Sequence, residues 1–187
     1  MNKTRCIWCG SDDIYVKYHD EVWGVPLHDD RLLFEMLILE GAQAGLSWIT
    51  ILKRREGYRK AFDNFDAKKV SKYSEKKQEE LLQNPNIIRN RLKIKSVITN
   101  ANIFIEIQKE FGSFDKYIWS YVKGKQINNK IKSHSQIPAR TELSDVISKD
   151  LKKRGMSFVG STIIYAYMQA IGLVNDHVTD CFRYKQV

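Results

Sequence analysis

Residues 141–172 decide the fold, and they read TELSDVISKDLKKRGMSFVGSTIIYAYMQAIG. Apolar residues recur at helical spacing on both sides of a short segment that holds two glycines, Gly155 and Gly160. A glycine directly after a basic last turn is typical of a helix end. The stretch therefore predicts two helices joined by a tight turn, with Ser161 or Thr162 as the cap of the second. The apolar positions of the first helix are Leu143, Val146, Ile147 and Leu151.

The same helical spacing continues toward the N-terminus. It predicts helices over about 29–44, 47–62, 74–83, 94–112 and 113–122. No run of residues alternates apolar and polar side chains as a half-buried strand does, so the predicted fold class is all-α. Residues 123–140 are expected to form a long loop, because they carry five positive side chains, no negative one and no helical pattern.

Length and composition limit the class of protein. A chain of 187 residues can bury a sizeable core, either as one domain over 1–187 or as two closely packed lobes. Hydrophobic residues at 43% and charged residues at 28% are normal for a globular protein, and 10 Gly with 3 Pro exclude collagen-like chains. The longest apolar stretch is too short to span a bilayer, and the N-terminal MNKTRC lacks the apolar part of a signal peptide. We therefore expect a cytoplasmic protein.

The charge balance is strongly basic. Lys and Arg number 31 against 22 Asp and Glu, which gives a formal net charge of +9. Such an excess favours a polyanionic partner, either nucleic acid or an anionic membrane surface. A Lys-rich surface that only keeps the protein in solution explains the charge equally well. Membrane-surface binding would need a helix with Trp or Leu on one face and Lys on the other, which the sequence lacks.

Four potential metal ligands lie near the two ends of the chain: Cys6, His19, His177 and Cys181. Two Cys and two His form a normal tetrahedral zinc set, and four protein ligands would make one Zn²⁺ ion structural, tying the chain ends together. The last two ligands share a face if their stretch is helical. Cys9 leaves an alternative open, because Cys6-x2-Cys9 is itself ligand spacing and Cys9 could replace His19. The simplest alternative is that these residues are unrelated.

The turn between the two C-terminal helices is a candidate phosphate site. Free backbone N–H groups at the start of the second helix can bind an anion, and Lys152, Lys153 and Arg154 would stand beside it. Such a site would position a DNA phosphate without reading sequence. The alternative is an ordinary pair of helices with glycine caps, which is a common arrangement.

A lone carboxylate and a group of aromatic residues suggest a ligand pocket. Glu40 follows the apolar run 36–39, and glutamate is rarely buried without a partner. Flat aromatic side chains can stack on a nucleobase, and four of them fall in the first quarter of the chain: Trp8, Tyr18, Trp23 and Trp48. The simpler explanations are a solvated glutamate at a helix end and ordinary core packing. Together with the charge and the turn, these residues favour a pocket for an extruded base.

Four long motifs stand in order along the chain: YHDEVWG (18–24), LEGAQAGLSW (39–48), KKRGMSFVG (152–160) and GLVNDH (172–177). They resemble the DNA-3-methyladenine glycosylase I family of the helix-hairpin-helix glycosylases, and the resemblance covers about residues 5–181. It implies an all-α, two-lobed fold with a helix-hairpin-helix over about 142–172 and a structural zinc. It also implies a DNA repair hydrolase of N-glycosyl bonds that excises 3-methyladenine from alkylated double-stranded DNA.

The resemblance implies roles at matching positions. Glu40 matches the glutamate that recognises the alkylated base, Tyr18 and Trp48 match aromatics that line its pocket, and Trp23 supports them. The metal ligands match Cys6, His19, His177 and Cys181. The expected DNA contacts are Lys153, Gly155, Gly160 and Ser161. Cys9 departs from the family pattern, which leaves open which thiol binds zinc.

A mechanism follows as a hypothesis. Methylation at N3 leaves adenine cationic and weakens its glycosidic bond, so Trp48 would stack on the cation and Glu40 would accept its N–H donors. Water would then capture the sugar cation, for which Asp176 is a weak candidate stabiliser. Because no lysine nucleophile is evident, we expect excision without strand cleavage, by a monomer that needs no protein partner. Competing interpretations are a non-enzymatic reader of alkylated DNA and a metalloprotein with an open zinc.

Overall fold

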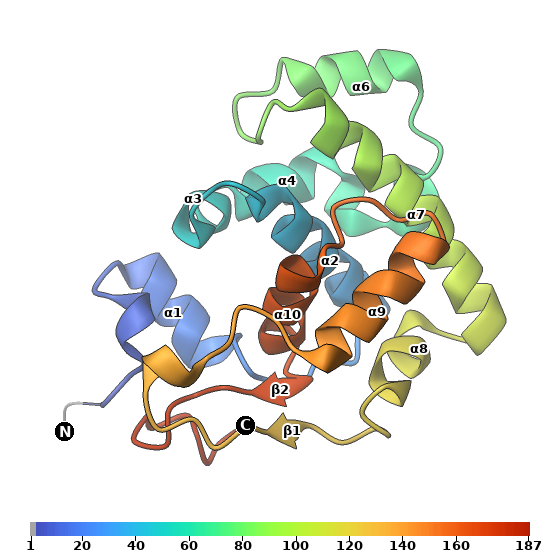
Figure 1. Cartoon of the computed structure of the whole chain (residues 1–187). Coiled ribbons are helices and arrows are strands. Elements are labelled where there is room, and N and C mark those ends of the chain that lie inside the picture. Colours follow the sequence, from blue (N-terminus) through green and yellow to red (C-terminus); the bar gives the residue numbers. More distant parts are fainter. Residues whose placement is uncertain (1–2) are drawn as a thin grey trace.

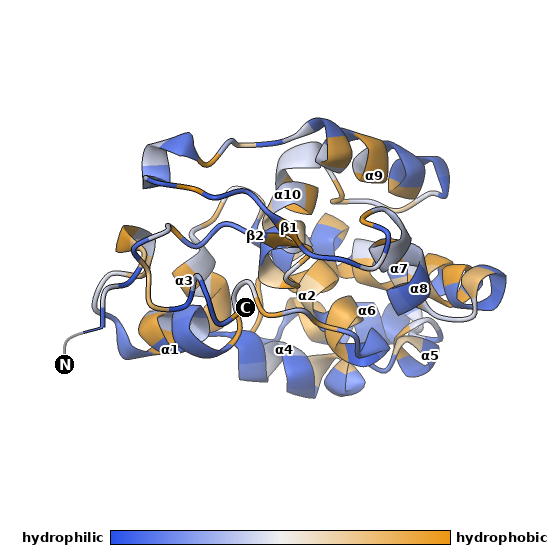
Figure 2. Ribbon diagram, turned by 90° about the horizontal axis from the view of Figure 1, so that it is seen from below, coloured by the Kyte–Doolittle hydropathy of each residue, from blue (hydrophilic) through white to orange (hydrophobic). Residues whose placement is uncertain are grey.

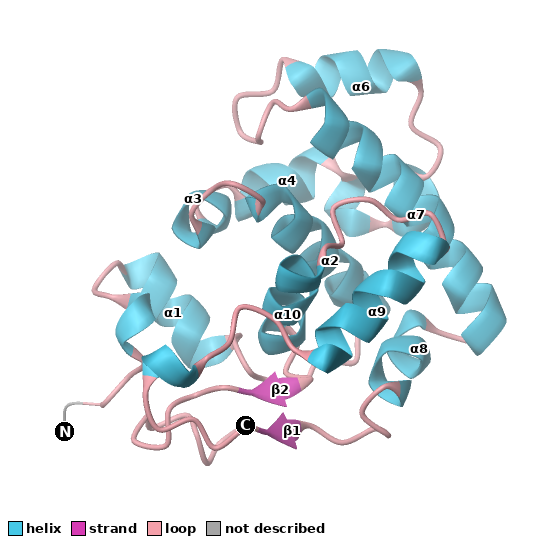
Figure 3. Ribbon diagram, viewed as in Figure 1, coloured by secondary structure: helices cyan, strands magenta, loops and turns pink. Residues whose placement is uncertain are grey.

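The computed structural model describes residues 3–187 and consists almost wholly of helices, which confirms the predicted all-α class (Figure 3). Single-turn 3₁₀ segments of the described residues lie at Ile7–Cys9, Asp63–Phe65 and His134–Gln136. No helix of the described part is long and apolar enough to cross a membrane. The α-helices of residues 3–187 are α1 (Asp13–Glu21), α2 (Asp30–Gln43), α3 (Trp48–Leu52), α4 (Arg55–Ala61), α5 (Ala67–Val70), α6 (Glu75–Leu82), α7 (Arg91–Phe111), α8 (Phe114–Ser120), α9 (Glu142–Lys153) and α10 (Ser161–Ala170).

Helices α2 and α10 form the centre of the molecule, with the other helices arranged around them (Figure 1). α2 is buried without interruption from Leu33 to Ala42, and α10 carries buried residues on most of its surface. Hydropathy colouring shows both helices as largely apolar, as expected for helices enclosed on all sides (Figure 2). The hydroxyl of Tyr167 on α10 donates to the carbonyl of Leu33 on α2 at 3.2 Å, which joins the two central helices.

Helices α9 and α10 form the predicted pair. α9 begins with a capping box, in which Ser144 N donates to Thr141 Oγ1 at 3.2 Å and Thr141 N donates to Ser144 Oγ at 2.8 Å. It ends at Gly155, whose φ of +101° is accessible to glycine at little cost. Of the apolar positions named for this helix, Val146 does not face the core, since it is 55% exposed.

The predicted cap of α10 is also wrong. The N-cap is Gly160 rather than Ser161 or Thr162, and it has no side chain with which to accept a hydrogen bond. The hydroxyl of Ser161 is instead 2.8 Å from the hydroxyl of Ser144 on α9, so it joins the two helices. The first backbone N–H groups of α10 are therefore left uncapped by any side chain of the described residues.

The single helix predicted over 47–62 is two helices, α3 and α4, separated at Lys53 and Arg54. The second of them carries two arginines to a buried carboxylate. Arg55 Nε donates to Glu35 Oε1 at 2.5 Å, and Arg59 Nε donates to the same carboxylate at 3.0 Å. Glu35 is fully buried on α2, and a buried carboxylate needs such partners.

The long loop predicted over 123–140 contains a short strand. β1 (Ile127–Asn128) pairs in parallel with β2 (Val174–Asn175). Two residues are too few to show the alternation that identifies a strand in sequence. The pairing carries the loop alongside the C-terminal segment and toward α1 (Figure 1).

Helix α1 has no counterpart among the predicted helices. Its buried face consists of Tyr18 and His19 rather than aliphatic residues, so it lacks the usual apolar stripe. Asp12 caps it by accepting a hydrogen bond from Ile14 N at 3.1 Å. This helix supplies one wall of the site described next.

Candidate active site and metal centre

A cavity of about 210 Å³ opens between α1, α2, α3 and α10. The structure brings Glu40 and its three predicted aromatic neighbours into this one cavity. Aromatic walls with a few polar groups suit a small planar ligand. The lining residues are Trp8, Tyr15, Tyr18, Trp23, Glu40, Gln43, Trp48, His134, Ile137, Ala166 and Gln169.

Glu40 is the acidic group of this cavity. It lies near the end of α2 and is 4% exposed, so it is not the solvated glutamate of the simpler explanation. Desolvation raises its pKa to about 8, and no charge or hydrogen bond of the described residues offsets that burial. Glu35, on the same helix, is also buried but is paired with two arginines. The contrast makes Glu40 the candidate carboxylate for binding a ligand in this cavity.

The aromatic side chains form the walls of the cavity. The rings of Tyr18 and Trp48 have centroids 5.4 Å apart, and Trp8 meets Trp23 edge to face at 4.9 Å. The indole N–H groups of Trp8 and Trp48 are buried without a hydrogen-bond partner among the described residues. Burial, followed by the nearby charge of Glu40, raises the pKa of Tyr18 well above its ordinary value. Its hydroxyl therefore stays protonated at neutral pH and can donate a hydrogen bond.

Other residues of the cavity carry no signal in the sequence. His134 and Ile137 come from the loop over 123–140, which β1 and β2 bring to the mouth of the cavity. Gln43 and Gln169 lie on α2 and α10, where a lone glutamine gives no indication of which way it points. Only the assembled structure identifies these four residues as part of the site.

The metal ligands expected from the sequence meet in one buried group: Cys6, His19, His177 and Cys181. Their potential ligand atoms all lie within 4.8 Å of one another. The thiol of Cys181 is 3.4 Å from His19 Nε2 and 3.5 Å from His177 Nδ1, and Cys6 Sγ is 3.6 Å from His177 Nδ1. His177 and Cys181 lie in a non-helical segment, so a shared helix face does not explain their proximity.

Neighbouring groups fix the orientation of both histidines. His19 Nδ1 lies 2.8 Å from Asp20 Oδ1, and His177 Nε2 lies 3.0 Å from the carbonyl of Trp23. The guanidinium of Arg5, and then His19, lowers the pKa of Asp20 to about 2, so this carboxylate stays charged. These contacts turn His19 Nε2 and His177 Nδ1 toward the two thiols, and His19 Nε2 also lies 3.3 Å from the backbone N of Cys6.

Cys9 stands outside this group. Its thiol donates to the carbonyl of Cys6 at 3.1 Å and does not belong to the four-ligand group. The alternative in which Cys9 replaces His19 is therefore not supported, because His19, and not Cys9, belongs to the buried group of four potential ligands.

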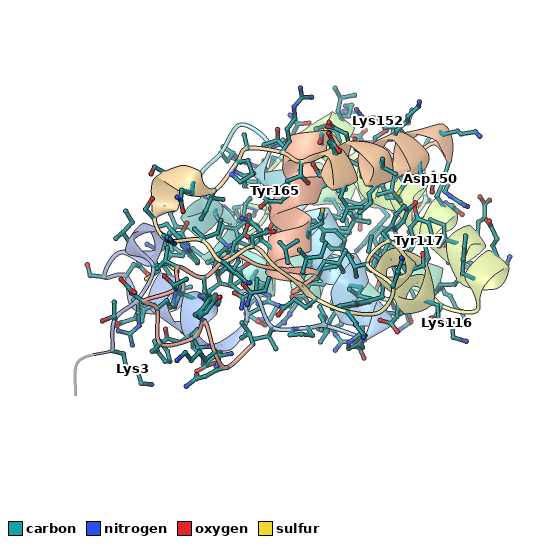
Figure 4. All side chains as sticks on the ribbon, turned by 60° about the horizontal axis from the view of Figure 1, so that its bottom comes forward. Lys3, Lys116, Tyr117, Asp150, Lys152 and Tyr165 are labelled. Atoms are coloured by element: carbon teal, nitrogen blue, oxygen red, sulfur yellow. The ribbon has the colours of Figure 1, made fainter. Side chains whose placement is uncertain are left out.

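The turn between α9 and α10 presents the four expected DNA contacts at the protein surface. Lys153 and Gly155 are exposed, and Gly160 and Ser161 are half-buried at the start of α10. Lys152 extends from the outer edge of α9 (Figure 4).

Arg154, which was expected beside the phosphate site, is engaged elsewhere. It lies 2.5 Å from Glu110 and 3.0 Å from Asp150. Asp150 also accepts a hydrogen bond from the hydroxyl of Tyr117 at 2.7 Å, which ties α8 to α9 (Figure 4). Arg154 therefore joins helices rather than standing free for an anion.

The turn packs directly against α2 beside Glu40. A Cβ added at Gly41 would lie 3.2 Å from the Cβ of Phe158, so only glycine permits this approach without displacement. Asn100 on α7 holds the turn from another side: it donates to the carbonyl of Ser157 and accepts from Ser157 N, both at 2.9 Å. The turn between α9 and α10 therefore lies directly beside the part of α2 that carries Glu40.

Asp176, the weak candidate for stabilising a sugar cation, is held by neighbouring polar side chains. It is fully buried and does not line the cavity in the described part of the chain. Its carboxylate accepts hydrogen bonds from Asn129 at 2.7 Å, Tyr165 at 2.6 Å and Gln169 at 2.7 Å. This residue organises its neighbours rather than facing the ligand.

Comparison with known proteins gives a consistent result. A family model described as methyladenine glycosylase matches residues 8–184. The chain is 47% identical over 178 residues to the DNA-3-methyladenine glycosylase of Haemophilus influenzae, covering 95% of this chain and 96% of that protein. It is 48% identical over 180 residues to DNA-3-methyladenine glycosylase 1 of Escherichia coli, covering 96% of each.

Solved structures agree with the sequence relatives. A crystal structure of 3-methyladenine DNA glycosylase I superposes with a TM-score of 0.93 at 50% identity, covering 96% of this chain and 98% of that one. The Staphylococcus aureus 3-methyladenine DNA glycosylase I, solved to explain its recognition of 3-methyladenine, gives 0.93 at 37% identity and 95% coverage of both chains.

Proposed function

The chain belongs to the methyladenine glycosylase family, and from that membership we propose that its cavity receives 3-methyladenine flipped out of alkylated DNA. The enzyme hydrolyses the N-glycosidic bond and leaves an abasic site for base excision repair. The observation that carries the proposal is Glu40, a buried carboxylate that no side chain of the described residues pairs, in a cavity walled by aromatic rings. An alkylated purine supplies the positive charge and the N–H donors that such a carboxylate lacks.

Recognition of the charge provides selectivity in this proposal. Methylation at N3 makes adenine cationic while it is still joined to the sugar, and the positive charge strengthens both stacking on Trp48 and hydrogen bonding to Glu40. Normal adenine is neutral and gains neither interaction fully. Tyr18 and Trp23 complete the wall against which the base packs. Glu40 ionises more readily once the cation is bound, because an opposite charge nearby favours the carboxylate.

The chemical step needs little from the protein beyond this recognition. A cationic base is already a good leaving group, so it departs with the electron pair of the glycosidic bond as neutral 3-methyladenine. Water then adds to the sugar at C1′ and releases its proton to solvent. Glu40 stabilises the positive charge that develops there. No lysine lines the cavity in the described part of the chain, which supports excision without strand cleavage.

The turn between α9 and α10 is the proposed contact with the DNA backbone. The uncapped N–H groups at the start of α10 suit a phosphate oxygen, and Lys153 adds a positive charge beside Gly155 and Gly160. These groups position the duplex and do not read its sequence. The cavity and the turn belong to one chain and one domain, so we propose that the enzyme acts as a monomer without a protein partner.

The metal proposed for the group of two Cys and two His is one structural Zn²⁺. A tetrahedral zinc with Zn–S of about 2.3 Å and Zn–N of about 2.0 Å places neighbouring S and N atoms about 3.5 Å apart. The observed S···N distances of 3.4, 3.5 and 3.6 Å fit this geometry. Four protein ligands leave no position for water, so the ion stabilises the fold. Through the Trp23 carbonyl, which contacts His177, it also stabilises a wall of the cavity.

The test of this function is release of bases from methylated duplex DNA, separated by chromatography, with the DNA product analysed in parallel. We expect free 3-methyladenine to appear and the strand to break only after alkali treatment, at the abasic site. DNA binding without release of any base would show a reader of alkylated DNA and would overturn the proposal. Strand breaks without alkali would contradict the single hydrolytic step.

A further inference from the structure

Gln169 is a polar residue of the cavity lining, and a hydrogen bond to a residue outside the lining fixes its orientation. It lies near the end of α10, half-buried, with its side chain on the cavity wall. Its Nε2 donates to Asp176 Oδ2 at 2.7 Å. The amide therefore joins the cavity to a buried carboxylate that itself lies outside the cavity lining.

Chemistry decides which end of the amide faces Asp176. The Asp176 carboxylate accepts hydrogen bonds from the Asn129 amide and the Tyr165 hydroxyl, so from glutamine it selects the NH₂ group and not the carbonyl. Asp176 is fully buried and also accepts from Asn129 at 2.7 Å and from the hydroxyl of Tyr165 at 2.6 Å, which holds the carboxylate in place (Figure 4 labels Tyr165 on α10). With its NH₂ group held in this way, Gln169 leaves its carbonyl oxygen for the cavity.

The carbonyl oxygen of Gln169 is one of several hydrogen-bond acceptors in the lining of the cavity. Gln43 has the same property, because its Nε2 donates to the carbonyl of Leu46 at 2.6 Å. Glu40 is the third acceptor of the cavity. A base edge that carries an amino group satisfies such a wall, whereas a carbonyl on the same edge would face an acceptor and lose its hydrogen bond.

We infer that Gln169 is a specificity-determining residue, whose fixed carbonyl favours an alkylated purine with an amino group at position 6 over one with a carbonyl there. The inference rests on the proposed function, since it assigns a further contact in the same cavity. It predicts preference for 3-methyladenine over 3-methylguanine, which carries the same methyl group and positive charge in DNA. Charge and stacking alone would not separate these two bases.

The test compares the two bases in a single reaction. Methylated duplex DNA that contains both lesions is treated with wild type and with Gln169→Met, which keeps the length of the side chain but removes its acceptor. We expect the rate of 3-methyladenine release to fall about tenfold, while release of 3-methylguanine changes less than about twofold. An equal fall for both bases, or no change in either, would overturn the inference and leave the proposed function intact. Failure of wild type to release either base would instead refute the proposed function.

Two further variants separate recognition from stability. Tyr165→Phe removes one of the hydrogen bonds that Asp176 accepts but keeps the hydrogen bond from Gln169, so the protein should lose stability while the ratio of the two release rates stays as in wild type. Asp176→Asn supplies an NH₂ group to Gln169, which allows the amide to turn and present its own NH₂ to the ligand. This variant should lower the preference for 3-methyladenine by about tenfold or more. An unchanged preference in folded Asp176→Asn would contradict the fixed orientation.

Discussion

Burial dominates the chemistry of Glu40. Its pKa of about 8 has desolvation as its cause, whereas Glu35, which lies earlier on the same helix, is paired with Arg55 and Arg59. Between its ordinary pKa of 4.5 and about 8, the folded protein holds a proton on Glu40 that the unfolded chain has already released. Stability contributed by this residue therefore falls as the pH rises through that window. This loss of folding stability comes from burying a carboxylate that has no partner in the described part of the protein and that a ligand can pair with.

Replacing this carboxylate should stabilise the protein. We expect Glu40→Gln to raise the free energy of unfolding at pH 8 by about 1–3 kcal/mol, since a neutral amide is less costly to bury than a carboxylate. The gain should shrink toward pH 5, where wild-type Glu40 is already protonated in the folded state. Denaturant unfolding at pH 5 and pH 8 measures both values. A variant less stable than wild type at pH 8 would contradict the unpaired burial of this carboxylate.

Some residues of the site could be identified from the sequence, and others could not. Glu40 stood out because it interrupts an apolar run, and the motif resemblance drew attention to Tyr18 and Trp48. Gln169 had no such signal, because its role depends on the position of Asp176 across a turn of the chain. The ion pair of Arg55 with Glu35 also had no signal, since the two residues lie on different helices.

At the scale of elements, α7 supports both functional regions. Lys93 Nζ donates to the carbonyls of Ala42 at 2.8 Å and Ala44 at 2.7 Å, where the chain leaves α2 just after Glu40. Asn100, about two turns further along the same face, holds Ser157 in the turn between α9 and α10. One helix thus contacts both the end of α2 beside the cavity and the turn for which we propose DNA contact.

The two contacts of α7 should have separable effects. We expect Lys93→Met to lower the rate of base release at saturating enzyme about tenfold, with DNA affinity changed less than about twofold. We expect Asn100→Ala to weaken binding to undamaged duplex about three- to tenfold, because the turn loses both hydrogen bonds. Single-turnover release and a DNA-binding titration measure the two effects. Lys95→Met removes the same charge from an exposed position of α7 and is the matched control; if it lowers release as much as Lys93→Met, the contact with α2 is not the cause.

Helices with an aliphatic stripe were predictable and others were not. α7 ends at Gly112 as its spacing indicated, and α9 begins at the predicted threonine. α1 was not predicted, because its buried residues are a tyrosine and a histidine and not a stripe of aliphatic residues. The strands β1 and β2 were not predicted, because a strand of two residues is too short to show the alternation of apolar and polar side chains.

At the scale of the whole molecule, the two chain ends are held together. Phe182 N donates to the carbonyl of Thr4 at 2.9 Å, and the group of two Cys and two His lies directly beside this contact. The sequence placed these ligands at the two ends of the chain, but only the fold shows that the four meet and that Cys9 does not join them.

Removal of the metal should destabilise the molecule. We expect a strong chelator to lower the Tm by about 10 °C or more, and Cys181→Ser to lose the bound zinc, since a tetrahedral set with three protein ligands is incomplete. Cys9→Ser should keep one zinc per chain and a Tm close to that of wild type. Elemental analysis and thermal unfolding measure both quantities. Loss of zinc in Cys9→Ser would contradict the assigned ligand set.

The most direct test of the account is the pH dependence of kcat/KM for release of 3-methyladenine, measured for wild type and Glu40→Gln. The free enzyme must ionise Glu40 to complement the cationic base, so kcat/KM should rise with pH, reach half of its maximum near pH 8 and level off above that pH. Glu40→Gln should lose at least about 100-fold at pH 8 and show no such rise. A variant that retains the rate and the pH profile of wild type would contradict the central role of this carboxylate.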